Sequence, residues 1–295
     1  MSAATVALLF AGCGNDDNEL PDNWNGEIRL SSGVAVQQTR ANSGDVPDKQ
    51  IAGGQKVGIY VSKADGETAD YTGYSNVSAK ADGNGNFSDY STMYYPQSGK
   101  GVKIAAYHPY NDGTADEYDF IVAEDQRTHV ADYYNSDLLY SAATEFARSS
   151  NACALTFEHK LCKITYTLKV GVGVSSVEDA TVEIVNVEKA VTFNRKTGAV
   201  TDVQSGNSPK GDVKLGEYGA IIAPQPVTQG TKLLKITLSA AAGGGVFYHT
   251  KADDTTFEKG NLYHYTITVN ATGLNVTSEI TPWNKQDKSG TAEME

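Results

Sequence analysis

The sequence is poor in cysteine, methionine and tryptophan, and these shortages exclude some classes of protein. Three cysteines, Cys13, Cys153 and Cys162, are too few for the disulfide scaffold of a small secreted domain. Cys153 and Cys162 could form one bridge, although a buried thiol in a hydrophobic core is the commoner role for Cys162. Three methionines against 17 tyrosines and 29 glycines favour strands and turns over packed helices.

Positive charge and long apolar runs are also in short supply. The formal net charge of −12 repels nucleic acid and anionic lipid surfaces. The apolar run at residues 6–13 is too short to span a bilayer. No segment shows a convincing helical period of 3.6 residues. These observations predict a soluble, extracytoplasmic protein.

Motifs of catalysis and metal binding are missing from the chain. Its five histidines form no His-x-x-x-His pair, and no Cys-x-x-Cys, Gly-x-Ser-x-Gly or phosphate-binding glycine loop occurs. Counted from Asp82, the sixth residue is Phe87 and the twelfth is Met93, where a calcium loop needs glycine and glutamate, so the acidic segment 82–89 predicts a hairpin turn. We therefore expect no enzyme, metal or cofactor, and a core position for His159. A carboxylate pair for glycoside hydrolysis stays open, because sequence does not show distances.

Short strands separated by polar turns fill the rest of the chain. The longest alternating segment is 154–170, whose apolar face changes parity at Leu161–Cys162, as a β-bulge would cause. Further strands are expected at 27–36, 56–61, 70–74, 92–95, 102–107, 119–123, 137–142, 181–187, 190–193, 199–203, 218–222, 233–239, 246–250, 262–269 and 274–280. This spacing predicts an all-β protein of antiparallel β-sandwiches, and 295 residues suit two of them.

The patterns divide the chain into four parts. Residues 1–12 are expected to be a signal segment, and 13–26 an acidic tether. Residues 27–150 and 151–295 are expected to form an N-terminal and a C-terminal sandwich domain, with a linker at 145–153.

The N-terminal run carries the first functional signal. Its end, Ala-Gly-Cys at 11–13, resembles the processing site of a bacterial lipoprotein signal, with cleavage before Cys13 and attachment of lipid such as palmitate to its thiol. The following stretch, Gly-Asn-Asp-Asp-Asn-Glu at 14–19, resembles the acidic surface-export signal of Bacteroidales lipoproteins. Lipid on Cys13 would hold the protein at the cell outer membrane.

A second resemblance covers nearly the whole chain. Segment 157–164, Phe-Glu-His-Lys-Leu-Cys-Lys-Ile, resembles the Phe-x-His-x-Leu-x-Lys-Ile strand of the Bacteroidales fimbrillin-like proteins, the type V pilins. Supporting matches are Gln-Thr-Arg-Ala at 38–41, Asp-Leu-Leu-Tyr at 137–140, Tyr-His-Tyr-Thr-Ile at 263–267 and Ile-Thr-Pro-Trp at 280–283.

The resemblance implies a fold and an assembly mechanism. The fold would be two tandem antiparallel β-sandwich domains of transthyretin-like type. An Arg- or Lys-specific protease would cut between Arg40 and Ala41, which removes the lipid anchor and the first strand, within 27–40. The vacated groove would accept a strand from another copy or a related pilin subunit, and the fimbria would grow head-to-tail and serve adhesion.

The same resemblance points to the donor of that strand. It would be the C-terminal segment 274–283, whose apolar residues are Leu274, Val276, Ile280 and Trp283. Two roles within the fimbria are alternatives to a stalk subunit. An anchor keeps its lipid and is not cut, whereas a tip accepts a donor strand and need not give one.

A monomeric surface lipoprotein that binds carbohydrate or a host protein is the remaining alternative. Tyrosines would supply its platform, among them Tyr71, Tyr74, Tyr94, Tyr95, Tyr133 and Tyr134. Aromatic residues on sheets also serve as cross-strand packing, so their presence alone does not decide between the two roles.

Overall fold

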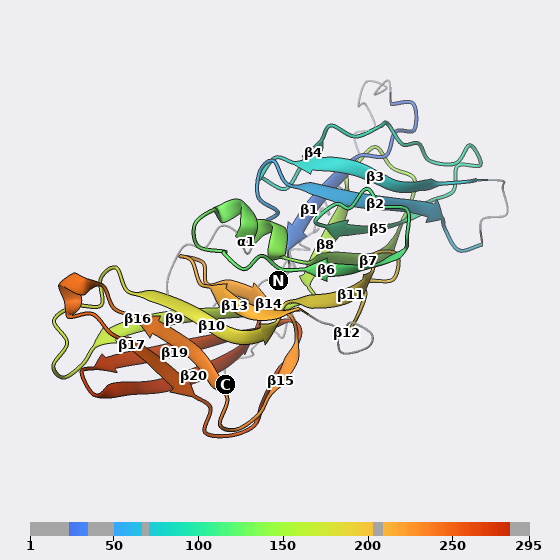
Figure 1. The fold of residues 1–295 in the computed structure, drawn as a ribbon. Coiled ribbons are helices and arrows are strands. Elements are labelled where there is room, and N and C mark those ends of the chain that lie inside the picture. Colours follow the sequence, from blue (N-terminus) through green and yellow to red (C-terminus); the bar gives the residue numbers. More distant parts are fainter. Residues whose placement is uncertain (1–23, 35–49, 67–70, 203–208, 284–295) are drawn as a thin grey trace, which may run out of the picture.

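A computed structural model describes residues 24–34, 50–66, 71–202 and 209–283. Strands make up 54% of the described residues and helices 4%, which confirms the predicted all-β, sandwich-type fold. Among the described residues, none of the helices has the length and apolarity needed to cross a membrane. Figure 1 shows two groups of strands, here called the N-terminal and C-terminal lobes, with a smaller group of elements between them.

The N-terminal lobe is built on one seven-stranded sheet in the order β1-β8-β7-β5-β2-β3-β4. Its strands are β1 (Leu30–Val34), β2 (Lys56–Lys63), β3 (Tyr74–Ala81), β4 (Phe87–Ser88), β5 (Val102–His108), β7 (Leu139–Phe146) and β8 (Cys153–His159). Isolated bridges join Ser31 to Asn86 and Glu27 to Tyr94. The two ends of the sheet therefore meet at β1 and enclose a core that includes Val57, Ile59 and Ile104.

The C-terminal lobe packs two sheets face to face around a second core. One sheet has the order β13-β10-β16-β17 and the other β14-β9-β19-β20, with a separate β15–β18 pair. The strands are β9 (Cys162–Val170), β10 (Thr181–Glu188), β13 (Lys210–Lys214), β14 (Ala220–Ile222), β15 (Gln225–Val227), β16 (Lys232–Thr237), β17 (Val246–Thr250), β18 (Thr255–Phe257), β19 (Asn261–Asn270) and β20 (Gly273–Pro282). Alternate apolar side chains on β10, β16 and β19 fill the space between the sheets.

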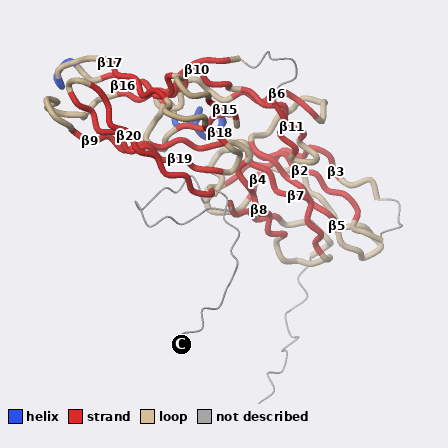
Figure 2. The backbone as a smooth tube through the Cα atoms, turned by 90° about the horizontal axis from the view of Figure 1, so that it is seen from below, coloured by secondary structure: helices blue, strands red, loops and turns tan. Residues whose placement is uncertain are grey.

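A third core joins the lobes. The sheet β12-β11-β6 pairs β6 (Glu117–Ile121) with the hairpin of β11 (Ala190–Asn194) and β12 (Ala199–Asp202), so both halves of the sequence contribute to it. Figure 2 places β6 and β11 between the two lobes. The hairpin turn contains Gly198 at φ +70°, where a Cβ would lie 2.2 Å from the ring of Tyr140. Only glycine allows this close approach.

The expected single strand at 154–170 is wrong, because the chain forms two strands that belong to different sheets. β8 pairs with β1 and β7, whereas β9 pairs with β14 and β19. The change of parity at Leu161–Cys162 marks this passage between sheets, and Leu161 is buried in the third core. The expected linker at 145–153 contains the loop between β7 and β8, two strands of the same sheet. By strand pairing, the chain passes from one lobe to the other near residue 160.

Other details differ from the expectations in smaller ways. Most strand pairs are antiparallel as expected, but β1–β8 and β9–β19 are parallel. The described residues form one short α-helix, α1 (Val130–Ser136), and no side chain caps its first turn. Its Tyr133 is buried in the third core, so tertiary packing accounts for this helix better than local propensity does.

Candidate functional site

The first candidate surface is the place that β1 occupies in the N-terminal lobe. Ile28, Leu30 and Val34 point into the core and are 2%, 5% and 8% exposed. We call their surroundings the β1 seat, which consists of Phe87, Met93, Tyr95, Cys153, Leu155 and Phe157. These residues come from two distant parts of the sequence, 87–95 and 153–157. The alternation of Ile28 and Leu30 was therefore visible from sequence, but the seat was not.

Backbone hydrogen bonds hold β1 on both of its long sides. On the β8 side, the amide of Cys153 donates to the carbonyl of Arg29 over 2.8 Å. On the opposite side, the amides of Ile28 and Ser32 donate to the carbonyls of Met93 and Gly85, each over 2.8 Å. Without β1, the seat would present unpaired backbone groups along two edges, and such edges are templates for another strand.

The second candidate surface is β20, an outer strand of the C-terminal lobe. It pairs with β19 over ten residue pairs, from Gly273 opposite Asn270 to Pro282 opposite Asn261. Leu274 and Val276 pack half-buried against the core, whereas Ile280 is 57% exposed. This strand therefore combines an apolar face with one long side that has no strand partner among the described residues.

Trp283, directly after β20, lies in a different environment from the other three predicted donor residues. It is buried in the third core and stacks on the imidazole of His159 with ring centroids 3.4 Å apart. Nδ1 of His159 lies 2.8 Å from the carboxylate of Asp137, whose carbonyl faces Nδ1 of His108 at 2.9 Å. Burial lowers the pKa of His108. The expectation that His159 is a core residue is confirmed, and Trp283 ties the end of β20 to the third core.

The remaining predicted site residues cannot be placed. Cys13, the expected lipidation position, and the Arg40–Ala41 cleavage site lie outside the described residues. They stay predictions, and of the predicted first strand within 27–40 the structure describes residues 27–34.

Four of the tyrosines proposed as a platform do come together. Tyr71, Tyr74, Tyr94 and Tyr95 line a cleft of about 590 Å³ with Pro96 and Gln97. The Tyr71 hydroxyl donates to the Tyr94 carbonyl over 2.8 Å, and the Tyr94 amide donates to the Tyr74 hydroxyl over 3.0 Å. These bonds fix both rings. Burial, more than the neighbouring Tyr74, raises the pKa of Tyr71 to about 12, so its hydroxyl stays protonated at neutral pH. Tyr133 and Tyr134 are on α1, away from this cleft.

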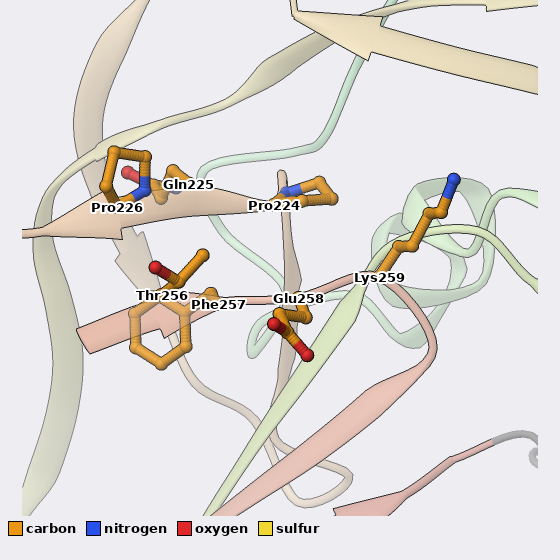
Figure 3. Close-up of a pocket in the computed structure, with 7 residues that line it drawn as sticks. All are labelled: Pro224, Gln225, Pro226, Thr256, Phe257, Glu258 and Lys259. Carbon is orange, nitrogen blue, oxygen red and sulfur yellow. The ribbon is translucent and has the colours of Figure 1, made fainter.

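Another cavity, of about 520 Å³, lies beside the paired strands β15 and β18 (Figure 3). Pro224, Gln225 and Pro226 form one wall and residues 256–259 the other. The Gln225 amide is already used within the protein, because it donates to the carbonyls of Glu188 and Ala223. Figure 3 shows the Lys259 side chain extending away from the two prolines. We assign this cavity no ligand.

Chemistry-bearing side chains do not gather into a site in the described part of the chain. No group of three His, Cys, Asp or Glu residues there could hold a metal ion. The predicted turn at 82–89 is a hairpin between β3 and β4, in which Asp82 Oδ1 accepts the amide protons of Asn84 and Asn86. Cys153 and Cys162 are buried free thiols, and Cys162 donates to the carbonyl of Glu258.

Comparisons with known proteins agree with this geometry. Residues 39–283 match a family model described as fimbrillin-like. A relative from Bacteroides uniformis, described as "Putative fimbrium subunit Fim1C", is 28% identical over 311 residues and spans 99% of this chain and 97% of its own. The structure of a "putative cell adhesion protein" from the same species has a TM-score of 0.65 at 25% identity, over 88% of this chain and 98% of that one.

A second solved structure, from Bacteroides ovatus, shows that the fold persists at lower identity. It is also described as a "putative cell adhesion protein" and has a TM-score of 0.64 at 16% identity, over 88% of this chain and 99% of that one. The family model covers far more than half of the sequence. The chain therefore belongs to the fimbrillin-like family, a structural and non-enzymatic class of proteins.

Proposed function

We propose that this protein is a structural subunit of a cell-surface fimbria that serves adhesion, with copies of itself or related pilin subunits as its partners. Membership of the fimbrillin-like family supports this role, as do relatives described as a fimbrium subunit and as cell adhesion proteins. In this proposal the precursor carries lipid on Cys13 and is held at the outer membrane. An Arg- or Lys-specific protease then cuts between Arg40 and Ala41.

The observation that carries the assembly step is the way β1 is held. The cut releases β1 from a seat that buries three of its apolar side chains and hydrogen-bonds it on both sides. Burying one such side chain stabilises a protein by about 1.5–3 kcal/mol, so an empty seat strongly favours the entry of another strand. Strand addition from a neighbour supplies both the backbone partners and the side chains.

The proposed donor is β20 of the neighbouring subunit. It already has a strand's conformation, and its apolar face is only partly covered in its own lobe. The seat lies in the N-terminal lobe and β20 in the C-terminal lobe. A contact between unlike ends of two copies does not close on itself, so it extends into a filament.

The cleavage step is tested with Arg40→Ala, and Arg40→Lys is its matched control. A low dose of trypsin should cut the unsubstituted chain and Arg40→Lys, and both should then form ladders on unheated gels and filaments in electron micrographs. Arg40→Ala should stay an uncut monomer. Normal polymerisation of Arg40→Ala would contradict the proposed site. An unsubstituted chain that stays monomeric after the cut would contradict the stalk role, and one that stays an uncut monomer would favour the anchor role or the monomeric binder.

A second candidate function, carbohydrate binding, is favoured by the tyrosine-lined cleft. The rings of Tyr71 and Tyr74 are fixed by hydrogen bonds, and Tyr94 is 40% exposed at the cleft. Rigid aromatic faces stack on the C–H faces of pyranose rings, and the Gln97 amide could bond to sugar hydroxyls. This function is compatible with a fimbrial subunit as well as with a monomeric lipoprotein.

Binding to an array of pyranose oligosaccharides tests this second candidate. The matched pair of variants is Tyr94→Ala and Tyr248→Ala, because the two tyrosines are 40% and 43% exposed and lie in different lobes. Tyr94→Ala should weaken the binding of any hit at least tenfold, and Tyr248→Ala should leave it unchanged. An array without hits, or hits that Tyr94→Ala does not affect, would remove the cleft from consideration.

A further inference from the structure

The two terminal strands carry the same side-chain pattern. On the face that β1 turns to the core, the order from N to C terminus is Ile28, Leu30, Ser32 and Val34. On the face that β20 turns to the core of its own lobe, the order is Leu274, Val276, Ser278 and Ile280. Both series therefore consist of two apolar residues, a serine and a third apolar residue at alternate positions.

The β1 seat requires this order. Its first, second and fourth positions hold the buried Ile28, Leu30 and Val34, whereas Ser32 is only half-buried. At Ser32 the chain passes close to Gly85, and a Cβ on Gly85 would lie 2.9 Å from the Ser32 carbonyl oxygen. A strand that enters the seat therefore needs apolar side chains at the first, second and fourth positions, and it can carry a small polar side chain at the third.

The outward positions differ between the strands, but the seat can accommodate the difference. On β1 and the residue before it they are Arg29, Ser31 and Gly33; on β20 they are Asn275, Thr277 and Glu279. The largest change is from Gly33 to Glu279. Gly33 is exposed, and no atom lies within 4 Å of the place where its Cβ would be, so the seat has room for a glutamate there.

We propose that β20 of one subunit enters the β1 seat of the next in the direction and register of β1, parallel to β8, with Val276 in the place of Leu30. This inference rests on the proposed strand exchange and specifies its geometry. Reversing the strand, or sliding it two residues toward its N-terminal end, places Ser278 where Leu30 is buried. Sliding it two residues the other way places Ser278 at Val34. A slip of one residue turns the apolar face outward.

A natural cysteine makes this register measurable. Leu30 lies opposite Cys153 in the β1–β8 pairing, and both side chains belong to the same core. Paired residues on neighbouring strands are close enough for a disulfide bond. In the proposed register Val276→Cys therefore lies beside Cys153 of the next subunit. If the strand is reversed, or slid two residues toward its N-terminal end, Ser278→Cys lies beside Cys153 instead. If it is slid two residues the other way, Leu274→Cys lies beside Cys153.

The experiment compares these three variants of the full chain. Each is cut with a low dose of trypsin, polymerised, oxidised with diamide and boiled in SDS without reductant. We expect a covalent ladder from Val276→Cys that dithiothreitol collapses, at least tenfold stronger than from the other two variants. The ladder should disappear when Val276→Cys is combined with Cys153→Ser.

The outcomes separate the register from strand exchange itself. Filaments of all three variants are first confirmed by electron microscopy. A ladder from Ser278→Cys or Leu274→Cys, or filaments of Val276→Cys that do not cross-link, would overturn the register and leave strand exchange standing. An unsubstituted chain that forms no filaments after the cut would overturn both proposals.

Discussion

At the scale of single residues, a few buried polar side chains fix the lobes to each other. Arg195 is 2% exposed although it sits in the β11–β12 turn. Its guanidinium donates to the carbonyls of Asn111 and Gly113 over 3.0 and 2.6 Å. One side chain thus satisfies two carbonyls that belong to the other half of the sequence, using the fork geometry that lysine lacks.

Replacing Arg195 with methionine should therefore destabilise the protein. The change keeps an unbranched side chain but leaves two carbonyls without this partner, which costs about 2–4 kcal/mol of unfolding free energy. Lys196→Met is the matched control. The ammonium group of Lys196 forms a 2.9 Å ion pair with Asp116, and both side chains are about half exposed. Losing this pair should lower the free energy of unfolding by about 0–1 kcal/mol. Urea unfolding measures both values, and equal losses would contradict the role of Arg195.

At the scale of elements, β1 is a full part of the precursor's core even though the proposed cut removes it. Leu30 is 5% exposed within the N-terminal lobe, and Ser31 faces the other side of the strand. If the cut discards β1, the side chains on this strand stabilise only the precursor. The same substitution should then have different effects before and after cleavage.

Leu30→Ala tests this difference. In the uncut chain it should lower the free energy of unfolding by about 2–5 kcal/mol, because it leaves a cavity in the core. Ser31→Ala, its control on the opposite face, should change stability by at most about 0.5 kcal/mol. Once cut, both variants should form filaments with the thermal stability of the unsubstituted ones. Less stable Leu30→Ala filaments would mean that β1 stays in the fibre.

The elements also show what sequence could and could not predict. The pattern of short apolar or alternating runs between polar turns located β2, β5, β10, β16, β17, β19 and β20. It failed at 154–170, since two strands of different sheets follow each other with only two residues between them and read as one. The strands β11 and β12 were predicted, but the pairing of β11 with β6 was not, because periodicity carries no information on partners. The β1 seat was invisible for the same reason.

At the scale of the whole molecule, the third core joins the two lobes, and we expect it to make them one cooperative unit. Phe193 on β11 is fully buried and lies 5.9–6.3 Å from the rings of Tyr107, Tyr118 and Tyr140, all from the N-terminal half. Trp283 adds the end of β20 to the same core. For a fimbrial subunit this coupling matters, since the seat and the donor strand lie in different lobes and tension along a filament would pass through the third core.

Phe193→Ala should weaken this coupling. We expect the unsubstituted chain to unfold in one calorimetric transition, with the calorimetric and van't Hoff enthalpies equal. Phe193→Ala should lower the free energy of unfolding by about 3–5 kcal/mol. It should also raise the ratio of the calorimetric to the van't Hoff enthalpy above one, because the lobes then unfold separately. Phe257→Ala removes an equally buried ring inside the C-terminal lobe, so it should lower the transition temperature and keep the ratio at one. Because only the first variant acts between the lobes, equal ratios in the two variants would show that the third core is not what couples them.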